Sequence, residues 1–181
     1  MQQIEERLEA LKSQVEAMQS RAPENKLAMV VFSGDLDKVL ASLVIATGAV
    51  AMGMDVVMFF TFWGTPVLRD KNKSVGGKDI MGNMFAAMLP KGADNVNLSQ
   101  MNMGGLGTAM MKNLMKKKNV ASLEEMFALA EELGVRIVIC EMSMDLMGFK
   151  REEMIAYEHL EFGGVARFLE EAGTSKAQLF I

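Results

Sequence analysis

Cys140 is the only cysteine among 181 residues and the strongest candidate for chemistry in the chain. It closes an apolar run, residues 135–140, that is typical of a strand buried on both faces. Open α/β sheets place their sites at the carboxyl ends of such strands. The next residues indicate a turn into a short helix, whose free N–H groups would lower the pKa of a thiol. Glu141 opposes that effect, and a buried structural cysteine explains the position equally well.

Few other residues offer chemistry of their own. His159 is the only histidine, so a zinc site cannot be built from Cys and His, and no intrachain disulfide can form. As a general base His159 is less favoured than as a structural or surface residue. The methionines are better explained by packing than by copper, so we expect no metal and no cofactor.

Glycine-containing stretches are candidates for phosphate or anion sites. Ser33 and Gly34 lie in a turn between a strand and a helix, but without the glycine spacing of a dinucleotide site. Gly104 and Gly105 precede a helix, and their N–H groups could form an anion-binding nest. All of these stretches are more readily explained as turns, and the last pair would suit a sulfur oxyanion.

The net charge of the chain limits the kinds of partner that it can bind. The chain has 19 basic and 23 acidic side chains, a net charge of −4, so we expect binding to neither nucleic acid nor membrane. Residues 39–64 are very apolar, but Asp55 and three glycines interrupt them, which favours a buried helix followed by a buried strand over a membrane span. No secretory signal pattern is present, and a lone thiol suits a reducing cytoplasm.

Alternation of apolar runs and helical patterns predicts one α/β domain over residues 26–181. Helices should cover both faces of a mainly parallel sheet. The pattern also predicts a capping box in which Ser122 and Glu125 begin a helix, and a helix closed by Gly173. Strands are expected at 26–32, 55–62, 135–140, 158–162 and 177–181, and helices at 36–52, 123–133 and 164–172.

Two segments stand outside this alternation. Residues 66–120 form a Met-rich insertion with helices expected at 80–89 and 106–118, placed to cover the binding crevice. Residues 1–22 predict an amphipathic helix with an apolar residue every three or four positions. That seam fits either a coiled coil or a helix packed on its own domain, and it consists of Ile4, Leu8, Leu11, Val15 and Met18.

Several separated motifs together resemble the DsrE/DsrF/DrsH-like family, in its Met-rich branch often described as sulfurtransferase or peroxiredoxin-like. The clearest is the signature around Cys140, residues 138–148. Others lie at residues 32–38, which include Ser33 and Gly34, at 59–64, which include Trp63, and at 99–105, which include Gly104 and Gly105. Residues 161–166 and 179–181 complete the resemblance, which covers residues 26–181.

This resemblance implies a three-layer α/β/α domain with a five-stranded, mainly parallel sheet. It implies a sulfur-relay protein, a sulfurtransferase in the broad sense, in which Cys140 carries sulfane sulfur or thiosulfate and passes it to a TusA-like carrier or another relay protein. It also implies a homo-oligomer, a trimer or hexamer. The alternative is a non-catalytic oligomeric module that binds a hydrophobic or anionic ligand, with a structural Cys140. The expected binding residues are Ser33, Gly34, Trp63, Gly104, Gly105, Met142 and Ser143.

Overall fold

Five parallel strands form a single sheet in the order β4-β3-β2-β1-β5. The computed structural model describes residues 2–19, 22–78 and 80–181. The predicted five-stranded α/β fold is confirmed, and the sheet is parallel throughout. Its strands are β1 Glu24–Val31, β2 Asp55–Phe60, β3 Arg136–Cys140, β4 Leu160–Gly163 and β5 Ser175–Phe180.

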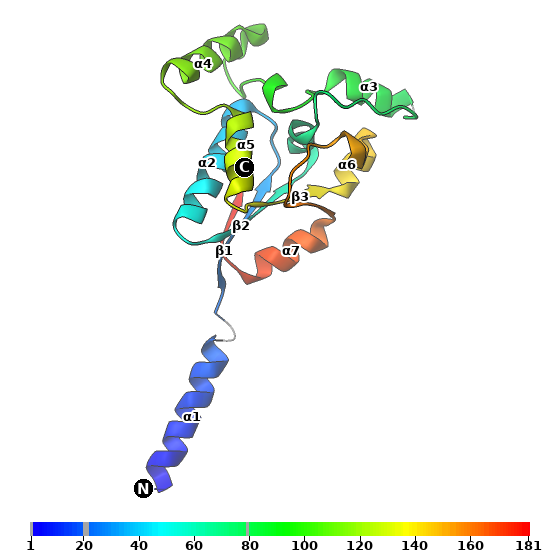
Figure 1. The fold of residues 1–181 in the computed structure, drawn as a ribbon. Helices are drawn as coiled ribbons and strands as arrows, with labels where there is room; N and C mark the ends of the chain where they lie inside the picture. The colour runs from blue at the N-terminus through cyan, green and yellow to red at the C-terminus, as the bar shows by residue number, and fades with distance from the viewer. Residues whose placement is uncertain (1, 20–21, 79) are drawn as a thin grey trace.

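Helices cover both faces of this sheet (Figure 1). On one face, α2 (Leu36–Ala51) packs against α5 (Leu123–Glu132) and over β1 and β2. On the other, α7 (Val165–Thr174) contacts β1, β4 and β5. The predicted capping box is present, because the Ser122 hydroxyl accepts the Glu125 N–H and the Glu125 carboxylate accepts the Ser122 N–H.

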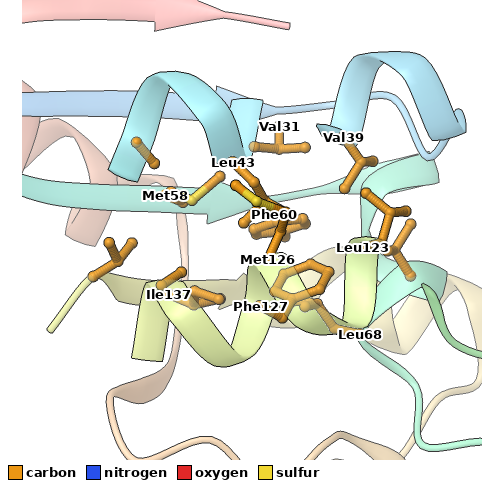
Figure 2. Close-up of a cluster of buried hydrophobic side chains, with 14 of the residues drawn as sticks. Val31, Val39, Leu43, Met58, Phe60, Leu68, Leu123, Met126, Phe127 and Ile137 are labelled. Atoms are coloured by element: carbon orange, nitrogen blue, oxygen red, sulfur yellow. The ribbon is translucent and has the colours of Figure 1, made fainter. Parts of the chain in front are cut away.

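Alternate residues along the central strands point to opposite faces, as the pleat of a strand requires. Met58 and Phe60 lie in the large core beneath α2 and α5, together with Leu43 and Phe127 (Figure 2). The intervening residues of β2 join a smaller cluster on the α7 face, against which Phe168 packs; its buried members are Val57, Phe59, Val138 and Cys140.

Some element ends differ from expectation. The α7 helix does not close at Gly173 but runs to Thr174, because Gly173 lacks the positive φ of a glycine helix stop, and β5 begins directly at Ser175. Strand β2 ends at Phe60, two residues early, since Phe62 adopts a left-handed backbone with φ of +43° that a strand cannot continue.

The Met-rich insertion contains the two expected helices, α3 (Ile80–Met88) and α4 (Leu106–Lys117). Helix α3 packs on α6 (Glu141–Met147), the short helix that follows β3. Gly148 ends α6 with φ of +63°, and a Cβ there would lie 2.5 Å from the Cα of Gly82. This close approach holds the insertion against the helix that begins beside Cys140.

The very apolar residues 39–64 cover most of α2, the whole of β2 and the start of a short 3-10 helix at Phe62–Leu68. None of the helices among the described residues is long and apolar enough to cross a membrane. The predicted N-terminal helix is present as α1 (Gln2–Gln19) and stands apart from the α/β domain (Figure 1).

Candidate functional site

Cys140 ends β3 and is the N-cap residue of α6. Its residue exposure is 3%, and its side chain lies on the α7 face of the sheet. Because β2 and β3 are parallel and Phe60 pairs with Ile139, the residue after Phe60 lies level with Cys140 at the carboxyl edge. That residue is Thr61, so two strands deliver a thiol and a hydroxyl to the same place.

A third side chain, Ser143 in the first turn of α6, completes the group. The hydroxyl oxygens of Thr61 and Ser143 are 2.9 Å apart, and both side chains are buried. The Ser143 oxygen also accepts the N–H of Phe62 at 2.9 Å. Ser143 therefore uses its oxygen to accept the Phe62 N–H, and it keeps its hydroxyl proton to donate either to Thr61 or to the sulfur of Cys140. The left-handed Phe62 is the backbone feature that aims its N–H at Ser143.

These neighbours lower the pKa of the Cys140 thiol from its ordinary value. Burial acts in the opposite direction and is the largest single influence. Hydrogen bonds from the Ser143 and Thr61 hydroxyls and from the N–H groups of Ser143 and Met142 together outweigh it. These hydrogen-bonding groups therefore stabilise a thiolate, which is the nucleophilic form of cysteine.

Glu141, which the sequence suggested would raise the thiol pKa, is paired with Arg151. The guanidinium of Arg151 also lies over the ring of Phe162, 4.8 Å from its centroid. The Glu141 carboxylate beside the thiol is thus paired with the Arg151 guanidinium, and the contact of that guanidinium with the Phe162 ring helps to hold it in place. The unfavourable charge predicted from sequence is balanced locally.

The expected binding residues divide into three groups. Met142 and Ser143 lie in the first turn of α6, beside Cys140. Ser33, Gly34 and Trp63 come together at the carboxyl end of β1, where they line a cavity of about 430 Å³. A Cβ at Gly34 would lie 2.2 Å from the carbonyl oxygen of Trp63, so the two turns touch through backbone. Cys140 does not line this cavity.

Gly104 and Gly105 form the third group and are not near the thiol. They precede α4, which Figure 1 shows well separated from α6. Both have positive φ, but the N–H of Gly105 and that of Gly107 already donate to the carbonyl of Asn102. Those two donors close a turn, so they are not available to an anion.

His159 lies immediately before β4, and its carbonyl accepts the N–H of Ile137. That contact is at the amino end of β3, three residues before Cys140, which excludes His159 as a base for the thiol. Among the residues that the structure describes, no three His, Cys, Asp or Glu side chains gather as a metal site would require.

Thr61 is the functional residue that was not singled out from sequence. Only the order of the strands indicates it: the residue after β2 must lie beside the residue that ends β3 once the two are known to be parallel neighbours. A threonine at a strand end is otherwise unremarkable, and the contact depends on Ser143, 82 residues later in the chain.

A five-stranded parallel sheet with helices on both faces and a single stabilised thiol at its carboxyl edge defines a thiol-bearing α/β protein. The chain belongs to the DsrE/DsrF/DrsH-like family, whose sequence model matches residues 23–180.

Two relatives span nearly the same length. The uncharacterized protein YrkE of Bacillus subtilis (strain 168) is 41% identical over 156 residues, which cover 86% of this chain and 96% of YrkE. The sulfur carrier protein DsrE2 of Allochromatium vinosum is 37% identical over 163 residues, which cover 87% and 99% of the two chains. The crystal structure of the ychN protein from E. coli shares the fold, with a TM-score of 0.53 at 11% identity over 86% of this chain and 98% of that one.

Proposed function

We propose that this protein is a sulfur carrier in which Cys140 holds sulfane sulfur as a persulfide and passes it to a thiol on another protein. The observation that carries the proposal is the group at the carboxyl edge of the sheet, where two hydroxyls and two backbone N–H groups stabilise the Cys140 thiolate. The relative named as a sulfur carrier, DsrE2, supports the choice of sulfur as the cargo.

The transfer is balanced without a redox partner. The Cys140 thiolate attacks the outer sulfur of a persulfide or polysulfide donor; the donor S–S bond breaks and the donor leaves as a thiolate that takes up a proton. An acceptor thiolate then attacks the outer sulfur on Cys140. The Sγ–S bond breaks, and the returning charge on Cys140 is received by the same hydroxyls and N–H groups.

Since Cys140 is the only cysteine, both donor and acceptor thiols must come from other molecules. The thiol is buried, but a persulfide places its reactive outer sulfur about 2 Å beyond Sγ. The neighbouring Met142 is exposed, so a docked protein can approach the site from the α6 side. We propose a small sulfur carrier of the TusA type as the acceptor.

The experiment is to incubate the pure protein with inorganic polysulfide, remove the excess and measure its intact mass. The expected result is the addition of one or more sulfur atoms that cyanide releases as thiocyanate. The Cys140→Ser variant is the matched control and should gain no mass. The proposal is refuted if the native protein gains none, or if the variant gains as much.

One observation favours a second function. The cavity lined by Ser33, Gly34 and Trp63 is large enough for a small ligand and does not include Cys140. A binding module would use that cavity and leave the thiol structural. In that case thiol titration should show slow labelling with a pKa at or above the ordinary cysteine value of about 8.5.

A further inference from the structure

The N-terminal helix presents an apolar seam that nothing in the described structure covers. Its large apolar side chains with described positions are 51% to 72% exposed, and these are Ile4, Leu8, Leu11 and Val15. The side chain of Met18, which the sequence places on the same seam, lies outside the described residues. Figure 1 shows α1 standing away from the α/β domain, so the seam does not pack on its own chain. Most helical stability in proteins comes from packing of an amphipathic face, so the uncovered seam of the 18-residue α1 favours an external partner.

The width of the seam indicates what kind of surface covers it. The exposed apolar residues occur at intervals of four, three and four, which is the heptad spacing of 3.5 residues. They occupy two of seven positions, whereas a helix that docks on a globular surface needs about three. The residues on either side, such as Arg7, Lys12 and Gln14, are polar. A narrow stripe of this kind fits a second helix rather than a broad groove.

The flanking charges select the direction of pairing. With Leu8 at heptad position a and Leu11 at d, Arg7 falls at g and Lys12 at the following e. A parallel, in-register pair would place Arg7 opposite Lys12 of the other helix twice, which is repulsive. In an antiparallel pair g faces g, so Arg7 meets the neutral amide of Gln14 instead. In that arrangement Leu8 packs against Leu11 of the second copy.

We propose that α1 is a self-association element that pairs with α1 of a second copy of this chain as a short antiparallel coiled coil. The pairing joins two α/β domains at opposite ends of the helix pair. Because the coiled coil is short, its own affinity is low. It strengthens association most when the α/β domains also contact one another, because helix pairing is then an intramolecular step within an existing complex. This proposal is independent of the sulfur chemistry assigned to Cys140.

The first test is sedimentation of the full chain and of the Leu8→Asp/Leu11→Asp variant. The expected result is a halving of the particle mass, because each lost leucine contact weakens association by about a hundredfold or more. Ser13→Asp lies on the opposite, exposed face of α1 and serves as the matched control with unchanged mass. Thermal unfolding of the domain should be the same in all three proteins. Unchanged mass in the double variant, or an equal loss in the control, would overturn the proposal.

The second test determines direction by cross-linking in a Cys140→Ser background. Oxidation of a mixture of the Leu8→Cys and Leu11→Cys proteins should give a disulfide between unlike chains, with little between like chains. Like-chain disulfides would show a parallel pair, and no cross-link in any combination would show that the helices do not pair; either result overturns the proposal. Lys12→Glu adds an independent check, because it would tighten a parallel pair by relieving the repulsion from Arg7 but should not tighten an antiparallel one.

Discussion

The Ser143→Ala substitution tests whether the hydroxyl group at this position activates the thiol. The Ser143 oxygen lies 2.9 Å from the Thr61 oxygen and accepts the Phe62 N–H at 2.9 Å, and its hydroxyl is the largest favourable influence on the Cys140 thiolate. A hydrogen bond to a charged group contributes about 1.5 to 3 kcal/mol. Since each 1.4 kcal/mol is a factor of about ten, the thiolate fraction near neutral pH should fall about 10- to 100-fold.

The assay is the rate of Cys140 alkylation by iodoacetamide as a function of pH, followed by intact mass. A lowered thiol pKa means that the thiolate persists to lower pH, so the native rate should begin to fall at a pH below the ordinary cysteine value of about 8.5. In Ser143→Ala the fall should begin at higher pH, and at strongly alkaline pH the two rates should converge. Convergence separates an effect on ionisation from an effect on access to the buried sulfur.

The matched control is Ser42→Ala, which removes another fully buried hydroxyl. Ser42 lies in α2 and donates to the Val39 carbonyl at 2.8 Å, away from the thiol. It should leave the pH profile of alkylation unchanged, whatever its effect on stability. If Ser143→Ala also leaves the profile unchanged, or lowers the rate equally at every pH, the hydroxyl does not stabilise the thiolate and the reasoning fails.

Three further outcomes follow from individual contacts. Thr61→Val should slow alkylation at neutral pH by less than Ser143→Ala, since Thr61 exerts the weaker influence of the two hydroxyls; an equal or larger loss would reverse that order. Glu171 is buried between Arg136 and Lys26, with a pKa lowered to about 2, so its stabilisation is complete above about pH 4.5 and is lost as pH falls toward 2. Glu171→Ala should destabilise the fold by about 3 to 5 kcal/mol in urea unfolding and flatten this acid dependence. Gly148→Ala should cost more than about 1 kcal/mol, because φ is +63° and the new Cβ meets α3 at 2.5 Å, whereas Gly173→Ala should gain about 0.5 to 1 kcal/mol in an open helical position; a gain in both would contradict the close packing of α3 on α6.

Much of the fold could be predicted because the local sequence pattern of each element agrees with the structure that the element adopts. Strands β2 and β3 are continuous apolar runs, as strands covered on both faces must be, and α5 begins with a capping box that the sequence spells out. The end of α7 was not readable, because Gly173 is a strong stop signal in isolation. Tertiary context overrides it, since the carbonyl of Glu171 accepts the Ser175 hydroxyl and leads the chain directly into β5.

Only part of the candidate site could be predicted from the sequence. Cys140 could be found by its position at a strand end, and Ser143 by its place one turn later. Thr61 could not be found without strand order, because the parallel neighbour of β3 is known only after the sheet is assembled. The buried Glu153, which contacts Arg69 and Lys78 of the insertion, was equally invisible, since sequence alone assigns carboxylates and lysines to the surface.

The insertion belongs to the framework of the site, although it contributes none of the groups at the thiol. Cys140 is held at the start of α6, and α6 ends where Gly148 contacts Gly82 of α3. The buried carboxylate of Glu153 ties the turn after α6 to two cations of the insertion, so the two segments form one packing unit. Helix α3 packs on α6 and presents exposed methionines, Met81, Met84 and Met88. A surface of flexible thioether side chains beside α6 can adapt to a partner without displacing the groups that stabilise the thiolate, and the proposed sulfur exchange with a separate protein would require this.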